Sequence, residues 1–159
     1  MGAGTSSDRT NLGRFAFRPA RMGDFVFCAQ RYFESMRWIM EALNLDETRQ
    51  RESFTAQWRL SEVRIIAIGE EDVGWLQTAT LEDSLFLKQL YVIERCRRRG
   101  IGADVMNALV EEAMRLRKAV TLAVVKINPA RRLYERLCFR ITHEDEHKIY
   151  LRRECNLAP

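Results

Sequence analysis

The strongest constraint on the fold is a change of hydrophobic period in the middle of the chain. Between residues 63 and 93, three segments rich in β-branched and aromatic residues follow one another, and only two or three residues separate each from the next. This composition is typical of strands, and connectors this short join antiparallel neighbours. The sequence therefore predicts an antiparallel meander of strands at 63–69, 72–80 and 84–93.

A helical period precedes this meander. Apolar residues recur at intervals of three and four from Phe25 to Leu43, which predicts an amphipathic helix of about five turns. Asn44 is expected to end this helix because asparagine tolerates the left-handed conformation. A second, more charged helix is predicted at 46–59.

The remaining segments complete an α/β (α+β) chain without internal repeats. Asn128 is expected to cap a helix that has Pro129 at its first position, where a proline has no helical hydrogen bond to lose. The other predicted elements are a strand at 14–20, a helix that starts at Ile101, a strand at 119–125 and a final hairpin of 138–144 and 146–153.

Size and composition fit one globular domain. The chain has 159 residues, of which 47% are hydrophobic, and this is enough for one core. We expect residues 13–155 to form the domain and residues 1–12 to be a flexible tail. The tail matches the loose N-myristoylation pattern at Gly2 and Ser6, but a chance match in a small polar segment is the simpler interpretation.

The residue types present argue against several classes of site and partner. Four widely spaced cysteines and two histidines give no metal-binding pattern, and they fit reduced thiols in the cytoplasm. No apolar run reaches the roughly 20 residues that span a bilayer, so no membrane partner is expected. The net charge of +4 is concentrated in a few arginines. This favours an anionic ligand over nucleic acid, which usually requires a broader basic face.

A basic, glycine-containing turn links the meander to the next helix and reads RRRGIG at 97–102. A dinucleotide-binding fingerprint would need a third glycine where Val105 stands, and no Gly-Lys-Ser/Thr of a nucleotide P-loop is present. Glycines leave the backbone amides uncovered, and the start of a helix adds unpaired N–H groups and the positive end of the helix dipole. The turn is therefore predicted to hold a diphosphate, with a merely solvated turn as the alternative.

Two segments resemble the GNAT acetyltransferase superfamily. The turn resembles its acyl-CoA-binding motif, Arg/Gln-x-x-Gly-x-Gly/Ala, with Arg97, Gly100 and Gly102 at the defined positions. The stretch NPARRLYERLCF at 128–139 resembles the family's Asn-x-x-Ala/Arg-x-x-Leu-Tyr-Glu-x-x-Gly-Phe segment, except that Cys138 stands where glycine is usual. The residues in register there are Asn128, Leu133, Tyr134, Glu135 and Phe139.

The resemblance extends to the order of elements over nearly the whole chain. It implies the GNAT fold, with a central mixed, mostly antiparallel, twisted sheet of about six or seven strands flanked by about four helices. It also implies acetyl-CoA as cosubstrate, and acetyl transfer to a primary amine by direct attack in a ternary complex. The residues that it assigns to cofactor binding are Leu90, Tyr91, Val92, Arg97, Arg98, Arg99, Gly100, Ile101, Gly102, Ala103, Asn128, Arg131 and Tyr134.

The resemblance also implies a role for each segment. Amides at 98–103 would hold the diphosphate, with charge-assisted contacts from the arginines. The backbone of 90–92 would pair with the pantetheine arm and polarise the thioester carbonyl. Tyr134 would be the catalytic acid that protonates the leaving thiolate, while a plain core aromatic is the alternative.

The base and the acceptor stay open at this point. His147 is a candidate base because histidine is the usual general base of proteins, but an exposed strand histidine is the simpler interpretation. In this family the first two helices and the last hairpin select the acceptor. The residues of this chain on that surface would be Glu34, Arg37, Trp38 and Glu41, together with residues 142–148.

Further alternatives concern the acidic turn and the class of protein. The acidic residues of the last hairpin, Glu144, Asp145 and Glu146, fit either a cationic acceptor or a solvated turn. A homodimer is left open. Two other classes are also left open: a non-catalytic acyl-CoA sensor of the same fold and a basic nucleic-acid-binding module.

Overall fold

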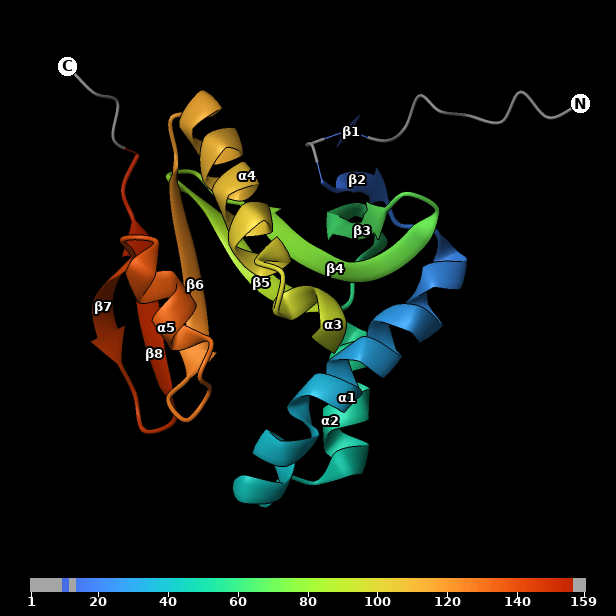
Figure 1. Ribbon diagram of the computed structural model, residues 1–159. Helices are drawn as coiled ribbons and strands as arrows, with labels where there is room; N and C mark the ends of the chain where they lie inside the picture. Colours follow the sequence, from blue (N-terminus) through green and yellow to red (C-terminus); the bar gives the residue numbers. More distant parts are fainter. Residues whose placement is uncertain (1–9, 12–13, 156–159) are drawn as a thin grey trace, which may run out of the picture. The chain divides into compact units, whose positions relative to one another are not determined.

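The structure, a computed structural model, describes residues 10–11 and 14–155, so Gly2 and Ser6 of the N-myristoylation pattern lie outside the described residues (Figure 1). The described part has eight strands and five α-helices. The strands are β1 (Thr10–Asn11), β2 (Ala16–Pro19), β3 (Val63–Ile68), β4 (Glu71–Thr80), β5 (Ser84–Val92), β6 (Ala119–Val125), β7 (Arg140–Glu144) and β8 (Lys148–Arg153). The helices are α1 (Phe25–Ala42), α2 (Glu47–Gln57), α3 (Glu94–Arg97), α4 (Ile101–Arg115) and α5 (Arg131–Arg136).

The order of these elements confirms the order predicted from the sequence. The sequence does not predict the two-residue strand β1 or the four-residue helix α3, because neither is long enough to show a hydrophobic period. The predicted start of the last helix is wrong. It begins at Arg131, and the Asn128 side chain accepts a hydrogen bond from the Ala130 amide at 3.0 Å in the turn before it.

Contacts divide the chain into two compact units. The first comprises Met1–Gln77 and Leu90–Ile101, and the second comprises Thr78–Gln89 and Gly102–Pro159. Strands β4 and β5 and helix α4 therefore contribute residues to both units. The predicted limits of the domain, 13 and 155, stay a prediction.

The strands of the first unit are antiparallel and follow the order β1-β2-β3-β4. Phe17 of β2 lies opposite Ile66 of β3, and Ile65 lies opposite Trp75 of β4. A register shift separates Ile66 from Ala67. The antiparallel pairing of β3 with β4, and the place of β5 next to β4 in the sheet, agree with the predicted meander.

Strand order in the second unit is β5-β6-β8-β7. β5 pairs in parallel with β6, whereas β6 with β8 and β7 with β8 are antiparallel. The parallel pair among antiparallel ones gives the mixed, mostly antiparallel sheet that was predicted. Arg153 of β8 donates to the Leu137 carbonyl oxygen at 3.0 Å, which holds the end of α5 against that strand (Figure 1).

An aromatic core joins α1, α2 and the sheet of the first unit. Phe54 of α2 packs against Phe33 of α1, with ring centroids 5.8 Å apart, and against Trp75 of β4 at 5.9 Å. Tyr32 packs on Phe33 at 4.8 Å and on Tyr91 of β5 at 5.4 Å. Because each ring contacts several others, helices and strands of this unit hold one another in place.

An ion cluster fixes the start of α1. The Arg18 guanidinium donates to both carboxylate oxygens of Asp24, at 2.9 and 3.0 Å, and to Asp72 of β4 at 2.8 Å. The hydrogen bond from Arg18 lowers the pKa of the Asp24 carboxyl. Strands β2 and β4 and the entrance to α1 are thereby tied together.

Three helices end in the same left-handed turn, and none of them uses glycine. Asn44, Arg117 and Cys138 have φ angles of 52°, 56° and 68°. At Asn44 the next amide, that of Leu45, donates to the Met40 carbonyl at 2.8 Å, which is the Schellman arrangement. This confirms the predicted end of α1.

Candidate functional site

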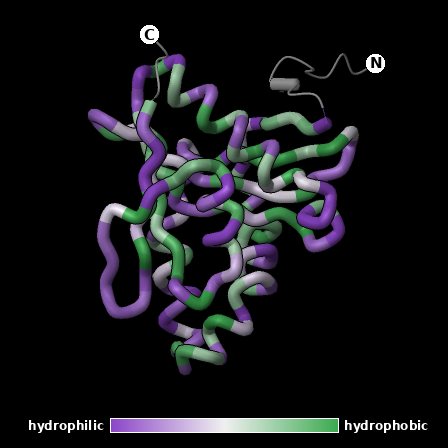
Figure 2. Tube along the Cα trace, turned by 60° about the vertical axis from the view of Figure 1, so that its left-hand side comes forward, coloured by the Kyte–Doolittle hydropathy of each residue, from purple (hydrophilic) through white to green (hydrophobic). Residues whose placement is uncertain are grey.

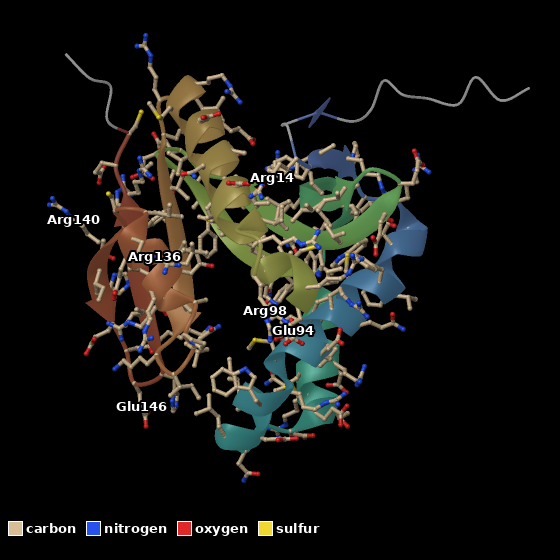
Figure 3. The ribbon with its side chains drawn as sticks, viewed as in Figure 1. Arg14, Glu94, Arg98, Arg136, Arg140 and Glu146 are labelled. Atoms are coloured by element: carbon tan, nitrogen blue, oxygen red, sulfur yellow. The ribbon has the colours of Figure 1, made fainter. Side chains whose placement is uncertain are left out.

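The glycine turn begins in the first unit, directly after α3. Arg97 is the last residue of α3, and Arg97, Arg98 and Arg99 are all exposed. Arg98 donates to Glu94 one turn earlier, at 3.3 Å. Figure 3 labels both side chains near each other. Gly100 has φ +76°, a left-handed conformation that other residues adopt only with strain. The turn therefore needs a glycine at this position and surrounds it with exposed guanidinium groups.

Arg14 brings a further guanidinium to this turn. A Cβ placed on Gly100 would lie 3.6 Å from Arg14 Nη2. The sequence analysis missed this residue, since 86 positions separate it from the turn and no local pattern connects the two. Only the folded chain places this fourth arginine beside Gly100.

Gly102 and Ala103 lie in the first turn of α4 and belong to the second unit. A Cβ on Gly102 would meet only Leu133 Cδ2, at 3.8 Å, which is an ordinary contact. The fold does not require glycine here. The missing side chain leaves the helix amides open, at the end of a helix where an anion is favoured.

Leu90, Tyr91 and Val92 form the end of β5 in the first unit, and Val92 is buried. The backbone of β4 approaches this segment very closely. A Cβ on Gly74 would lie 2.3 Å from the Tyr91 carbonyl oxygen and 3.1 Å from Val92 Cα. Gly74, which the sequence analysis did not single out, is thus required by the backbone that carries the predicted pantetheine-binding residues.

The pairing of β5 with β6 covers only part of both strands. Residues 84–87 pair with 119–122, whereas β5 continues to Val92 and β6 to Val125. Beyond these pairs, Ala123, Val124 and Val125 pair with β8. The parallel pairing therefore ends at Leu87 of β5 and Leu122 of β6.

Tyr134 lies in α5 of the second unit, and a Schellman turn fixes its helix. The Cys138 amide donates to the Glu135 carbonyl at 3.1 Å, and the Phe139 amide donates to the Tyr134 carbonyl at 3.0 Å. The Tyr134 and Phe139 rings pack edge to face with centroids 5.9 Å apart, the hydrophobic contact that accompanies this motif. Cys138 thus adopts, with φ 68°, the conformation for which glycine is usual, and the turn is kept.

The Tyr134 side chain is 8% exposed, and burial raises the pKa of its hydroxyl to about 12. Among the described residues its hydroxyl has no hydrogen-bond partner, although the oxygen is not fully enclosed. The ring is therefore part of the core, while the hydroxyl stays protonated at neutral pH. The packing supports the core interpretation, and the role of Tyr134 as catalytic acid stays a prediction.

The other two predicted cofactor residues of this region have local partners. Asn128 accepts from the Ala130 amide, which uses its side-chain oxygen in the turn before α5. The Arg131 Nε donates to Glu135 at 3.2 Å, one turn along the same helix. Either residue must reorganise before its side chain can contact a ligand through these atoms.

The acidic hairpin of the second unit binds its own groups. Asp145 accepts from the amides of Lys148 and His147, at 2.8 and 2.9 Å, and from the Tyr150 hydroxyl at 2.9 Å, and these hydrogen bonds lower its carboxyl pKa. Glu144 pairs with Lys126 at 3.5 Å. The structure favours the solvated turn over a cation site. His147 is exposed, as the simpler interpretation expects, but it lies in the turn one residue before β8 and not in the strand.

Further features of the described residues concern a metal site, a membrane-spanning helix and disulfides. No group of three or more His, Cys, Asp or Glu side chains among the described residues could hold a metal ion. No helix in residues 10–11 and 14–155 is long and apolar enough to cross a membrane, and Figure 2 shows hydrophobic positions interleaved with hydrophilic ones. The four cysteines are free thiols.

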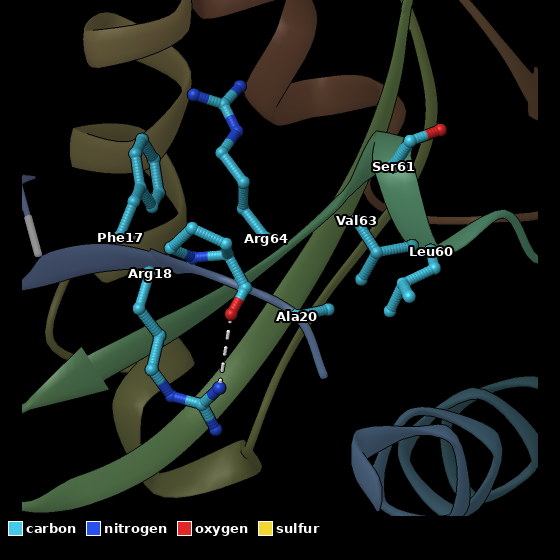
Figure 4. A pocket seen from close by; sticks show the side chains of 8 residues that line it. Phe17, Arg18, Ala20, Leu60, Ser61, Val63 and Arg64 are labelled. Atoms are coloured by element: carbon cyan, nitrogen blue, oxygen red, sulfur yellow. Dashed lines mark hydrogen bonds between the residues drawn. The ribbon is translucent and has the colours of Figure 1, made fainter. Parts of the chain in front are cut away.

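A hollow of about 720 Å³ opens between β2 and residues 60–64 in the first unit (Figure 4). The Arg64 guanidinium lies over the Phe17 ring, 4.9 Å from its centroid. Arg18 donates to the Pro19 carbonyl at 3.3 Å and is already held by two carboxylates. None of the predicted site residues lines this hollow.

Within each unit, the structure brings part of the predicted set together. In the first unit, the arginines at 97–99 and Gly100 lie in one turn. The end of β5 in the same unit packs closely against Gly74. In the second, Gly102 lies beside Leu133, whose neighbour in sequence is Tyr134.

Several solved structures similar in fold to this chain are named as acetyltransferases. The PaiA N-acetyltransferase of Thermoplasma acidophilum, in complex with coenzyme A, has a TM-score of 0.73 and 13% identity, and the match covers 88% of this chain and 98% of the other. The ribosomal-protein-S18-alanine N-acetyltransferase of Escherichia coli has a TM-score of 0.64 and 16% identity, with 91% and 96% covered. Ard1 of Thermoplasma volcanium has a TM-score of 0.62 and 16% identity, with 89% and 97% covered. At these identities the likeness shows the fold, which is the GNAT fold.

A sequence profile shows the family. The profile described as "Acetyltransferase (GNAT) family" matches residues 30–139, more than half of the chain. The chain therefore belongs to the GNAT acetyltransferase family. No curated protein sequence matches it.

Proposed function

We propose that this protein is an N-acetyltransferase that moves the acetyl group of acetyl-CoA directly to a primary amine in a ternary complex. The observation that carries the proposal is Gly102, a glycine that the fold itself does not need. Its open helix start follows three exposed arginines. This arrangement fits a ligand with a diphosphate.

Each part of the site contributes a separate interaction to the cofactor. Amides of the turn and of the first turn of α4 would hold the diphosphate, and Arg97, Arg98, Arg99 and Arg14 would balance its charge. The backbone of 90–92 would pair with the pantetheine arm, and an N–H there would stabilise the oxyanion as charge develops.

In the chemical step the amine nitrogen forms a bond to the acyl carbon and the carbon–sulfur bond breaks. The neutral amine gives up one proton to solvent, and the departing thiolate takes one proton from solvent, so CoA leaves as the thiol. Tyr134 keeps its hydroxyl proton at neutral pH because its pKa is about 12. A thiol with an ordinary pKa of about 8.5 is a stronger acid, so the hydroxyl stabilises the developing thiolate mainly by donating a hydrogen bond.

Thermal denaturation with acetyl-CoA, followed by turnover with a panel of amines, amino acids and peptides, tests the proposal. Ligand at about 100 times its dissociation constant should stabilise the protein by ~2.7 kcal/mol. Turnover is measured as released CoA thiol and as the mass of the acetylated product. An unchanged melting curve at saturating acetyl-CoA would refute cofactor binding. Binding without thiol release from any acceptor would instead favour the non-catalytic sensor.

A further inference from the structure

A pocket of about 280 Å³ lies between the end of α1 and the start of α2, entirely within the first unit. Its volume is at the lower end for small-molecule sites, so its ligand must be small. Apolar and charged side chains both line it. They are Phe33, Arg37, Met40, Glu41, Asn44, Leu45, Glu47 and Arg51.

The α2 wall of this pocket neutralises its own charges. Arg51 donates twice to Glu47, at 3.0 and 3.2 Å, and its guanidinium lies over the Phe33 ring, 4.3 Å from the centroid. Phe33 and Met40, which belong to α1, are both buried and provide the apolar surface of the pocket.

The α1 wall carries one positive and one negative group. Arg37 and Glu41 are four residues apart, so both project from the same face of the helix. Neither makes an ion pair with any side chain in residues 14–155, and both are exposed. An arginine that precedes a glutamate by four positions is the weaker of the two orders for an ion pair within a helix. The two groups are thus available to a ligand.

We propose that this pocket binds a free α-amino acid with an apolar side chain, such as leucine or methionine. Its carboxylate accepts from Arg37, which matches carboxylates in a planar, two-point arrangement. Its ammonium donates to Glu41, and its side chain packs on Phe33 and Met40. A zwitterion fits because its opposite charges lie side by side, as do Arg37 and Glu41. Arg37 and Glu41 belong to the surface that the family resemblance assigns to the acceptor, so this inference names a class of acceptor and rests on the proposed function.

Calorimetric titration of the full chain with L-leucine and L-methionine, without acetyl-CoA, tests the pocket. We expect saturable binding with a dissociation constant of about 0.1–10 mM. Leucine amide, which lacks the carboxylate, and 4-methylpentanoate, which lacks the amine, should each bind at least about tenfold more weakly, because each loses one charge-assisted contact. Equal affinity for leucine and either analogue would overturn the proposal.

Substitutions in the pocket test whether leucine binds at Arg37 and Glu41. Arg37→Gln and Glu41→Gln should each weaken leucine binding by about tenfold or more. Arg49→Gln and Glu52→Gln, exposed α2 changes outside the pocket, should leave it unchanged. Absence of leucine binding, or equal loss in pocket and control variants, would refute the site. Acetyl-CoA stabilisation, measured in parallel, keeps that outcome distinct from failure of the proposed function.

Discussion

Gly74 and Gly102 both lie next to backbone that we propose binds the cofactor, but the absence of a side chain matters for a different reason at each position. At Gly74 a Cβ would lie 2.3 Å from the Tyr91 carbonyl oxygen, so the fold excludes any side chain. At Gly102 a Cβ would make one ordinary contact, at 3.8 Å. Packing explains the first glycine, whereas for the second we propose that a ligand is the reason. A substitution should therefore lower stability at one position and affinity at the other.

Tyr134 combines both kinds of requirement in one residue and gives the largest expected effect. Tyr134→Phe keeps the ring against Phe139 and removes the hydroxyl. We expect nearly normal acetyl-CoA affinity and turnover reduced by about 10- to 10³-fold, mainly in kcat, because the thiolate charge develops only in the transition state. Steady-state kinetics under conditions where chemistry limits the rate measures this.

The control for this experiment is Tyr134→Ala, which leaves a cavity and should cost ~3–5 kcal/mol of stability. A phenylalanine variant that acetylates at the wild-type rate would make Tyr134 a core residue only.

Gly102→Val tests the ligand side of the comparison. A β-branched side chain at the helix start would block the approach of the diphosphate to the amides. Acetyl-CoA binding should fall by about 100-fold or more, or ~2.7 kcal/mol, while the melting temperature of the free protein changes little. Gly102→Ala, which fits the family motif, is the matched control and should keep binding. Equal affinities of Gly102→Val and wild type would remove the diphosphate from this turn.

The contribution of Tyr134 to the fold should appear at alkaline pH. Burial raises its pKa to about 12, above the ordinary value of 10. Between these two pH values the unfolded chain releases the proton and the folded chain keeps it. The free energy of unfolding should therefore fall with rising pH, by about 1–3 kcal/mol in total. Denaturant titrations from pH 9 to 12 measure the slope. A slope no steeper than that of Tyr134→Phe would argue against the buried hydroxyl.

Gly74→Ala tests the structural side of the comparison. The added methyl group must displace the backbone at Tyr91 and Val92, and overpacking of this kind costs ~1–3 kcal/mol. Denaturant unfolding should show this loss, whereas Gly102→Ala should show little. If both alanine variants are equally stable, the close approach of β4 to β5 is not a constraint.

Cys138→Gly carries the smallest expected effect. Cys138 holds φ 68°, which costs an ordinary residue about 1–2 kcal/mol. Glycine relieves that cost but adds freedom to the unfolded chain, so a net gain of ~0.5–1 kcal/mol is expected. A higher melting temperature with unchanged turnover would support this balance. A lower melting temperature would show that the thiol makes a stabilising contact.

The sequence by itself determined the elements and the family. Hydrophobic period and connector length predicted α1 and the meander, because these signals are local and repeat over many residues. The turn at 97–102 and the segment at 128–139 likewise predicted the family, since each motif is contiguous. The sequence did not determine the exact start of α5, because the Asn128 side chain stabilises a turn as well as a helix cap.

Only the tertiary structure decided which residues surround these motifs. Arg14 lies beside Gly100, Gly74 lies against Tyr91, and Arg37 with Glu41 faces Arg51 across a pocket. Each of these arrangements joins residues that are distant in the chain, or depends on which face of a helix a neighbour covers. Chain folding sets such distances through packing of the whole unit. A local pattern records the tendency of a segment to form a helix or strand, and contains no information on what that segment will pack against.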